Sequence, residues 1–428
     1  MTETAGAPKV RISEQTTRVF DRLTQDPSVH RAFDFLKEDN ERTTGEQIEL
    51  TEIEAPTFEE AEKGRLFARK LSELGVEDVA VDEAGSVFGL RKGNGSGPRL
   101  VVCAHLDTVF PRGTNVQARR EGSRIYAPGI ADDGRGLASV LTLLRALNQA
   151  GLRTEGDLLV GATVGEEGLG DLRGVKTLFA GRRDLDGFIS IEPGTPDRIT
   201  YLGAGSKRYK VTFEGPGGHS FGSFGTPSPI HALGRAIGRI ADLEVPHHPK
   251  TTFNIGVVQG GTSVNTIAET AEAVIDLRSV SREHLERLES RVLELIRQAA
   301  HDENSRWRRT DAIKVRIERV GDRPAGSQSP DSAIVQAAAG AGIAMGFRPI
   351  LEGPSSTDAN VPIDLGIPAV TLGGGGDFGG AHTLGEYYDP TDAHLGVQKI
   401  LLTILGLVGL AGVTDPLLPK RSGQQAED

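Results

Sequence analysis

The sequence contains almost no cysteine and no cluster of basic residues. Cys103 is the single cysteine among 428 residues, which excludes a disulfide framework within the chain and a metal site built from several thiolates. Asp and Glu number 59 against 48 Lys and Arg, for a formal net charge of −11. No run of Lys and Arg interrupts this acidic balance, so the chain lacks the electrostatic signature of a nucleic-acid-binding protein.

Long apolar segments are also absent. The longest one, residues 401–413, is shorter than the ~20 residues that a membrane-spanning helix needs, and it predicts a buried helix instead. The first 18 residues are polar and lack the apolar core of a secretory signal. We therefore expect a cytoplasmic protein without a membrane partner, and its length predicts two domains.

Buried strands alternate with helices on both sides of the middle of the sequence. Continuous apolar runs predict strands that are buried on both faces, at residues 99–104, 157–164, 187–191 and 368–372. Apolar residues at helical spacing predict helices at residues 56–75, 137–147, 332–345 and 398–410. This alternation is typical of an α/β fold with a mostly parallel sheet, to which we assign residues 14–206 and 322–418.

The middle of the sequence follows a different order. Strands are predicted at residues 208–213, 252–258, 271–277 and 314–319, and helices at residues 229–243 and 281–300. The resulting order, βαββαβ, is typical of the ferredoxin-like α+β arrangement. We therefore expect a complete small domain at residues 207–321, inserted into the α/β domain.

Polar residues suited to metal binding follow several of the predicted strands. They are His105 with Asp107, Asp132, the pair Glu166 and Glu167, Glu192, and His382. A neutral imidazole binds a metal, and a carboxylate two residues further along an extended chain can orient the ring. In the Glu166–Glu167 pair, one carboxylate can hold a metal while the other acts as a base on water. Because open α/β sheets bind ligands at the carboxyl ends of their strands, we expect one metal site here.

Nine short motifs extend this pattern across the chain. They are HLDT (105–108), YAPGIADD (126–133), EEG (166–168), IEP (191–193), GGHS (217–220), GTSVN (261–265), DLR (276–278), TDAN (357–360) and AH (381–382). From about residue 50 to residue 412 the sequence resembles peptidase family M20, and within it the branch of carboxypeptidase G2 and succinyl-diaminopimelate desuccinylase. The resemblance implies a catalytic α/β domain with an inserted ferredoxin-like lid domain that mediates dimerisation.

The resemblance implies a pair of zinc ions in each subunit. One ion would be held by His105, Asp132 and Glu192. The other would be held by Asp132, Glu167 and His382, so that Asp132 bridges the two. Co²⁺ and Mn²⁺ are alternatives for the same nitrogen and oxygen ligands.

The resemblance also implies catalytic roles. Glu166 would be the general base and acid. Asp107 would be the catalytic residue that orients and polarises the imidazole of His105. His219 would reach the site of the neighbouring subunit, which implies a homodimer formed through the lid domain.

Three further residues are implied in substrate binding. Asn265 and Arg278 match family positions that bind a substrate carboxylate or the oxyanion, since Arg offers a two-pronged donor. Gly374 lies in the glycine run 373–376, where backbone can approach the substrate closely. The chain departs from the family at Gly134, where Lys or a similar residue is usual, and Arg135 beside it is the candidate to replace that charge.

The residues and the resemblance together predict a zinc-dependent hydrolase. It would cleave the amide bond of a peptide or an N-acyl amino acid with a water molecule activated between two zinc ions. We expect an exopeptidase on small peptides, of which a carboxypeptidase is one kind; the direction of trimming stays open. An amidohydrolase acting on N-acyl, N-succinyl or N-carbamoyl amino acids is an alternative that leaves the site unchanged. A non-catalytic zinc-binding scaffold is the remote alternative. Such a protein would have lost Glu166 or a metal ligand, and every one of these positions is filled in this chain.

Overall fold

The chain divides into two compact units. The computed structural model describes residues 10–95 and 97–421. The first unit runs to Leu202 and resumes at Ser327, and the second, which we call the inserted unit, is Gly203–Gly326. The bounds of the inserted unit lie a few residues outside 207–321, because its first and last strands extend beyond their apolar residues.

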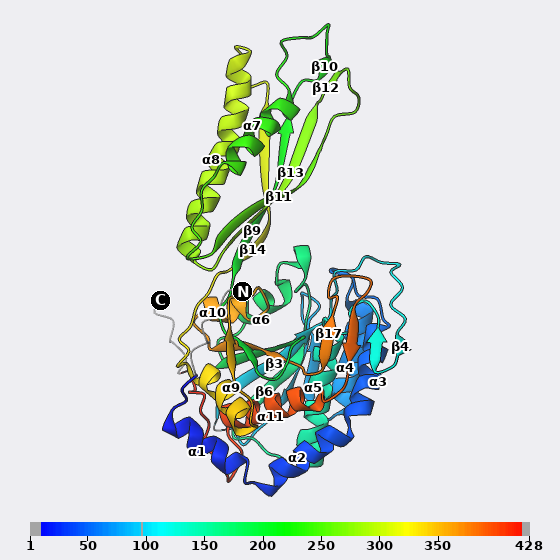
Figure 1. Ribbon diagram of the computed structural model, residues 1–428, viewed down its shortest axis with the longest axis vertical. Coiled ribbons are helices and arrows are strands. Elements are labelled where there is room, and N and C mark those ends of the chain that lie inside the picture. The colour runs from blue at the N-terminus through cyan, green and yellow to red at the C-terminus, as the bar shows by residue number, and fades with distance from the viewer. Residues whose placement is uncertain (1–9, 96, 422–428) are drawn as a thin grey trace, which may run out of the picture. The chain divides into compact units, whose positions relative to one another are not determined.

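An eight-stranded sheet forms the centre of the first unit (Figure 1). Its strands in spatial order are β1 (Glu77–Val81), β2 (Val87–Arg91), β6 (Asp157–Thr163), β3 (Arg99–His105), β7 (Gly187–Glu192), β16 (Ala369–Gly373), β8 (Arg198–Thr200) and β15 (Ile350–Glu352). The pairs β6–β3, β3–β7, β7–β16 and β8–β15 are parallel, and the other pairs are antiparallel. The predicted α/β class with a mostly parallel sheet is confirmed, and the four predicted strands are adjacent in it.

Helices lie before, between and after these strands in the chain. They are α1 (Glu14–Leu23), α2 (Pro27–Glu38), α3 (Asn40–Thr51), α4 (Ala61–Glu73), α5 (Gly134–Gln149), α6 (Arg173–Ala180), α9 (Ala333–Ala344), α10 (Asn360–Asp364) and α11 (His394–Val408). The apolar stretch at 401–413 forms the end of α11 and the turn after it, and this helix is buried along most of its length. Across the described residues, no helix is long and apolar enough to cross a membrane.

Both faces of the central strands are covered, which explains why their apolar runs are continuous. In β3, Val102 packs into a cluster with residues of α5, α9 and α11, whereas Val101 and Cys103 pack into a second cluster with residues of α6 and α10. Burial of each such aliphatic side chain contributes about 1.5–3 kcal/mol. These two layers of helices fix the sheet and, with it, the positions of the strand ends.

One predicted helix starts later than its sequence pattern indicates. The helix expected from Pro56 to Gly75 begins only at Ala61. The residues before it form a loop, in which the hydroxyl of Thr57 donates to the carboxylate of Asp107 at 2.8 Å. The prediction of a helix starting at Pro56 is therefore wrong, because tertiary polar contacts outweigh the local helix propensity there.

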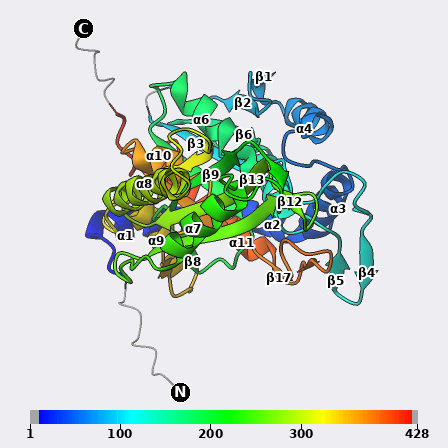
Figure 2. The ribbon, with the colours of Figure 1, turned by 90° about the horizontal axis from the view of Figure 1, so that it is seen from above.

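A second, four-stranded sheet belongs to the first unit and lies at one side of it (Figures 1 and 2). In spatial order it contains β17 (Asp377–Gly379), β18 (Tyr387–Asp389), β5 (Arg124–Tyr126) and β4 (Arg119–Glu121). Strands of three residues are too short for apolar periodicity to reveal. The pairing of β5 with β18 brings the turn at 127–133 next to the loop at 380–386.

The inserted unit is a four-stranded antiparallel sheet with two helices packed against it. Its elements are β9 (Gly205–Glu214), α7 (Pro229–Ala241), β11 (Thr251–Gly260), β13 (Thr270–Ser279), α8 (Arg282–Arg306) and β14 (Lys314–Arg323), with a short ribbon of β10 (Gly218–His219) and β12 (Thr266–Ile267). The sheet order β11-β13-β9-β14 and the chain order βαββαβ are those of a ferredoxin-like fold, as predicted. Apolar residues of α7, α8 and the sheet form a separate core.

Candidate metal centre

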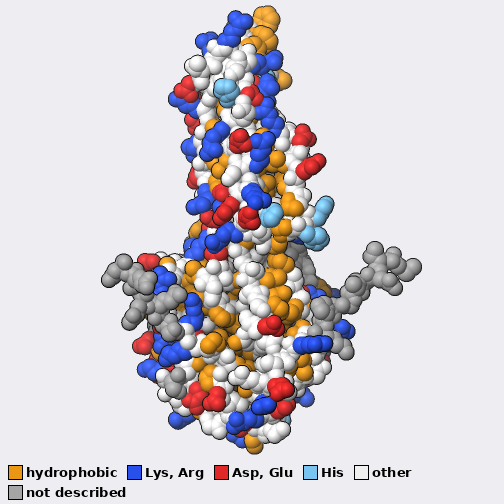
Figure 3. Space-filling model, turned by 90° about the vertical axis from the view of Figure 1, so that its left-hand side faces the viewer, with side chains coloured by type: hydrophobic (Ala, Val, Ile, Leu, Met, Phe, Trp, Pro, Cys, Tyr) orange, Lys and Arg blue, Asp and Glu red, His pale blue; other side chains and the backbone are white. Residues whose placement is uncertain are grey.

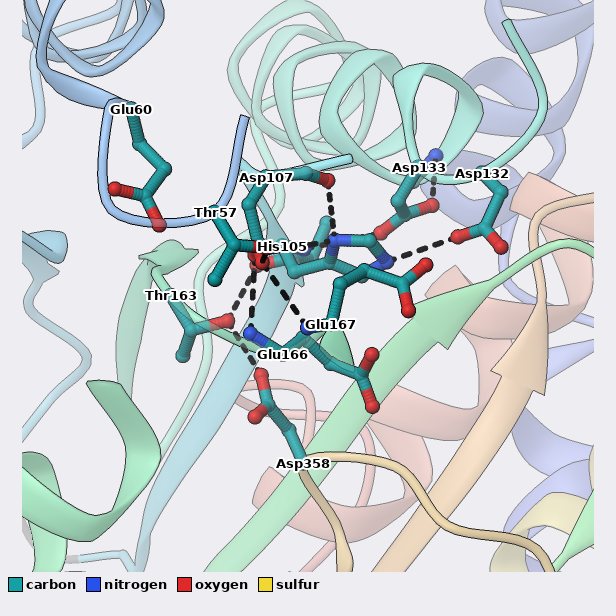
Figure 4. A network of polar contacts seen from close by, with 12 residues as sticks. Thr57, Glu60, His105, Asp107, Asp132, Asp133, Thr163, Glu166, Glu167 and Asp358 are labelled. Carbon is teal, nitrogen blue, oxygen red and sulfur yellow. Dashed lines mark hydrogen bonds and ion pairs between the residues drawn. The ribbon is translucent and has the colours of Figure 1, made fainter. Parts of the chain in front are cut away.

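The neighbouring strands β6, β3 and β7 end at the same edge of the central sheet. His105 is the last residue of β3 and Glu192 the last residue of β7, and the parallel register of the two strands brings them level. The loop after β6 carries Glu166 and Glu167 to the same place, as Figure 4 shows. Strands far apart in the sequence thus deliver imidazole and carboxylate groups to one position, where α/β sheets bind ligands.

His105 is buried and held in one orientation. Its Nδ1 donates to the backbone carbonyl of Asp107 at 2.9 Å, so Nε2 carries the lone pair in the neutral ring. This Nε2 lies 2.9 Å from Oδ1 of Asp132 and 3.7 Å from Oε2 of Glu192. Burial opposes a charge on the ring, but the carboxylates of Glu192, Asp107 and Asp132 raise the pKa of His105 well above its usual value. A lone pair that faces two carboxylates requires a cation between them, either a proton or a metal ion.

Two adjacent aspartates before α5 have separate tasks. Asp133 caps α5 by accepting from the amide of Gly136 at 2.9 Å, and its other oxygen accepts from the amide of His105 at 3.0 Å. Asp132 instead points into the site, with Oδ1 toward His105 and Oδ2 3.1 Å from Nε2 of His382. The peptide bond between the two aspartates is cis. The pair therefore contains one helix cap and one carboxylate that faces two imidazoles.

Glu167 and His382 form the other side of the site. Nε2 of His382 lies 2.8 Å from Oε1 of Glu167, on a loop where this histidine is half-exposed. Hydrogen bonding to Asp132 raises the pKa of His382 to about 9. Burial raises the pKa of Glu167, and the charge of Asp132 adds to this effect. Carboxylate charge is again concentrated around an imidazole.

The carboxylate of Asp107 makes hydrogen bonds to the loop after β6 and not to the ring of His105. Its carboxylate accepts from the amides of Glu166 and Glu167, both at 3.0 Å, and from the hydroxyl of Thr57. The carboxylate oxygen nearest Nδ1 of His105 is 3.6 Å away, whereas the backbone carbonyl of Asp107 is the hydrogen-bond acceptor of that ring. The backbone carbonyl of Asp107 therefore holds the imidazole in place, whereas the prediction gave this task to its carboxylate.

Three overlapping groups of these side chains have ligand atoms within 4.8 Å of one another. They are His105 with Glu166 and Glu167, His105 with Asp133 and Glu192, and Asp132 with Glu167 and His382. Both oxygens of Asp133 are taken by amide donors, so this residue is a poorer ligand than Asp132. Within the described part of the chain, Oε1 of Glu192 is buried without a hydrogen-bond partner, and burial raises the pKa of Glu192 well above its usual value. Imidazole nitrogens, crowded carboxylates and an unpartnered buried oxygen fit a divalent cation such as zinc.

The structure adds buried polar residues that the motifs do not indicate. Glu386 accepts hydrogen bonds from three amides of the turn that carries Asp132. Lys63 of α4 is buried nearby, and burial lowers its pKa to about 8 against the opposing charge of Asp107. The sequence signal for Glu386 is only its place four residues after His382. Lys63 gives no signal, because it lies outside every motif.

Arg135 and Gly374 secure the glycine-rich loop behind the site. Arg135 is fully buried, and its guanidinium donates to the carbonyl oxygens of Gly374 at 2.8 Å and Ala393 at 3.0 Å. The amide of Gly374 donates to the carbonyl of Glu192 at 2.9 Å. Both backbone groups of Gly374 are thus used within the fold, and the charge of Arg135 is directed at backbone carbonyls.

The remaining predicted residues lie in the inserted unit, where they occupy two separate places. His219 is in β10 and Asn265 precedes β12, and the amide of Ser220 donates to the carbonyl of Asn265 at 3.0 Å. Nδ1 of His219 accepts from two amides of the turn after it, at 3.2 Å, which leaves Nε2 as the donor of the neutral ring. Arg278 lies near the end of β13, opposite Ser206 of β9, and its Nε donates to Asp276 at 2.7 Å.

Comparisons with known proteins show which family this chain resembles. The profile of peptidase family M20/M25/M40 matches residues 101–405. The uncharacterized protein YqjE of Bacillus subtilis is 26% identical over 345 residues, which cover 77% of this chain and 89% of that protein. Carboxypeptidase G2 of Pseudomonas sp. is 29% identical over 242 residues, or 52% of this chain and 55% of that enzyme. The solved structure of YXEP from Bacillus subtilis, a dinuclear metal-binding peptidase of the M20 family, has a TM-score of 0.62 at 20% identity, over 86% of this chain and 99% of that chain.

The candidate metal ligands gather at the edge of a mostly parallel sheet. Because the family profile spans most of the chain, the chain belongs to peptidase family M20/M25/M40. It is an enzyme of the M20 metallopeptidase and amidohydrolase class, as its motifs predict. The likeness to the solved structure, at low sequence identity, concerns the fold alone.

Proposed function

We propose that this enzyme hydrolyses an amide bond at one end of a small peptide with two divalent cations bound at the edge of its central sheet. One observation carries the proposal. Two imidazoles and three carboxylates lie together beside Glu166, in contacts of 2.8–3.7 Å. The contributing residues are His105, Asp132, Glu167, Glu192 and His382.

The arrangement of Asp132 supports a shared ligand. Its two oxygens face different imidazoles, those of His105 and His382. We assign one zinc ion to His105, Asp132 and Glu192, and the other to Asp132, Glu167 and His382. Co²⁺ and Mn²⁺ suit the same donors. The orphaned oxygen of Glu192 supports the first set.

Glu166 is proposed as the base and acid of the reaction. Bound divalent cations polarise an amide carbonyl and bring the pKa of a water molecule toward neutrality. Glu166 accepts a proton from the attacking water as the new C–O bond forms, and it passes that proton to the leaving amine as the C–N bond breaks. Its position supports this role, because one of its oxygens lies within 4.8 Å of a ring nitrogen of His105. Asp107 fixes the loop by accepting the amide of Glu166.

Residues of the inserted unit are proposed to contact the substrate. His219 would donate from Nε2 to the developing oxyanion in the site of a second copy of the chain, which makes the enzyme a homodimer. Arg278 would bind a substrate carboxylate through the guanidinium nitrogens that do not contact Asp276. Asn265 would donate its side-chain amide, since its backbone carbonyl is already paired.

Metal analysis and a substrate panel test the proposal together. The purified protein should carry two divalent cations per chain, lose activity when they are chelated, and regain it when zinc, cobalt or manganese is returned. The panel should contain di- and tripeptides blocked at either end, and N-acyl, N-succinyl and N-carbamoyl amino acids. Cleavage of peptides with one required free end supports the exopeptidase. Preference for the acylated amino acids would replace it with an amidohydrolase. A protein that holds no cation and hydrolyses nothing in the panel would overturn the proposal.

A further inference from the structure

A buried carboxylate outside the ligand set organises the turn that carries Asp132. Glu386 is fully buried and lies in the loop between β17 and β18. Its Oε1 accepts from the amides of Ala131 at 2.9 Å and Asp132 at 3.0 Å, and its Oε2 accepts from the amide of Gly129 at 2.8 Å. Three amides of one short turn therefore converge on one side chain.

This side chain is not placed to be a ligand. Each of its oxygens faces amide hydrogens, so its lone pairs are directed at the backbone. The turn has further supports, since Gln47 donates to the carbonyl of Ile130 at 2.7 Å and the amide of Gly134 donates to the carbonyl of Gly129 at 3.1 Å. Among the described residues, the amide of Asp132 itself donates to Glu386.

The same loop also presents His382. Glu386 follows His382 by four residues, and its backbone carbonyl accepts from the amide of Ala127 at 3.2 Å. Beside it, Tyr387 of β18 pairs with Tyr126 of β5. One segment therefore fixes the turn of Asp132 through the Glu386 carboxylate while it carries the imidazole that Asp132 faces.

We propose that Glu386 is a positioning residue of the metal centre, which holds the carboxylate of Asp132 in register with His105 and His382. Cation affinity then depends on a carboxylate that touches no cation. This inference rests on the proposed function, because it requires that Asp132 and His382 bind cations. Partners that orient metal ligands typically change metal affinity by about 10–100-fold when they are removed.

The test compares Glu386→Gln with Asp389→Asn. In the glutamine variant the negative charge is lost. In addition, the side-chain NH₂ is a donor and would face a backbone amide that is also a donor, so that hydrogen bond cannot form. Asp389 is a matched control, because it lies at the end of the same segment but binds Ser123 and Thr391 at the surface. Zinc affinity would be measured by competition with a chromophoric chelator, zinc content by mass spectrometry, and unfolding of the chelated proteins by circular dichroism.

We expect Glu386→Gln to bind zinc about 10–100-fold more weakly than the wild type, while Asp389→Asn stays within about threefold. Excess zinc should restore most of the activity of Glu386→Gln, because the ligands themselves are intact. If Glu386→Gln does not fold, Glu386→Asp takes its place. It keeps the charge but is one methylene shorter, and it should also bind zinc more weakly than the wild type.

The outcomes separate this inference from the function beneath it. Equal zinc affinity in the folded Glu386 variant and the wild type overturns the role of Glu386, even if the chelated variant unfolds more easily. An equal loss of affinity in Asp389→Asn overturns it too, since the effect would then be general damage to the loop. A wild type that binds no zinc or related cation removes the proposed metal centre, and this inference with it.

Discussion

Two buried carboxylates of this protein, Glu303 in the inserted unit and Glu192 in the first unit, are satisfied in different ways. In the inserted unit, Glu303 is fully buried and both its oxygens are satisfied, Oε1 by the indole of Trp307 and a backbone amide, Oε2 by Arg235 at 3.1 Å. In the first unit, Glu192 has a buried oxygen without a partner among the described residues, and its other oxygen lies 3.7 Å from the ring of His105. The charge of Glu303 is balanced within the inserted unit, whereas the charge of Glu192 would be balanced by the proposed cation.

Side chains of both signs are mixed over the visible face of the inserted unit (Figure 3). On α8, for example, Arg291 pairs with Glu294 at 2.5 Å. Such exposed pairs contribute about 0–1 kcal/mol, whereas an unbalanced buried charge costs several kcal/mol. A buried carboxylate without a balancing partner, such as Glu192, lowers the stability of the fold, and such groups are typical of functional sites.

The largest expected effect is the loss of turnover in Glu166→Gln, a substitution that should leave cation binding unchanged. Glu166→Gln should lower kcat by about 1,000-fold or more, because proton transfer is lost. The content of bound cations should stay at the wild-type level, measured by mass spectrometry on the same sample. Glu167→Gln is the matched variant, and it should lower cation content as well as turnover. Turnover close to wild type in Glu166→Gln would remove this residue from the role of base.

Removal of the cations should act on one unit only. A cation present at about 1,000 times its dissociation constant stabilises the protein by about 4 kcal/mol. After chelation, hydrogen exchange monitored by mass spectrometry should therefore speed up in peptides from the ends of β3, β6 and β7. Peptides from the core of the inserted unit should exchange as before. Equal acceleration in both units would contradict the proposed contrast.

Substitution of Glu303, the buried carboxylate of the inserted unit, should change stability but not cation content. Glu303→Ala leaves the guanidinium of Arg235 without its partner and should cost about 3 kcal/mol of unfolding free energy. Urea unfolding would measure this loss, and cation content per folded chain should not change. A fall in cation content without a loss of stability would contradict the comparison.

A further expected effect concerns Lys399, a buried amine of α11. Its Nζ has no hydrogen-bond partner among the described residues, and burial lowers the pKa of Lys399 to about 7. An unfolded lysine has a pKa of about 10.4, so between pH 7 and 10 the unfolded chain binds more protons and stability rises with pH. Lys399→Met should therefore be more stable than the wild type at pH 7, and this advantage should shrink toward pH 10. Urea unfolding at several pH values measures the difference; a gap that does not change with pH would show that Lys399 is not the cause.

Much of the fold could be predicted because its signals are local. Continuous apolar runs identify β3, β6, β7 and β16, since strands covered on both faces carry no polar alternation. Strands of three residues, such as β5 and β18, are too short to leave a period. The predicted helix start at Pro56 is wrong for a different reason. The residues before Ala61 form a loop in which Thr57 contacts Asp107, and this contact spans 50 residues, so local sequence does not reveal it.

The sequence by itself determined which chemistry is available, since each candidate ligand stands in a short motif at the end of a predicted strand or in a loop near one. Tertiary structure decided how the work is divided between neighbours. It made Asp133 a helix cap and turned Asp132 toward two imidazoles, and it placed Glu386 under the amide of Asp132 across 254 residues of chain. Contacts at such separations arise from the packing of whole elements, so they leave no pattern in the residues beside them.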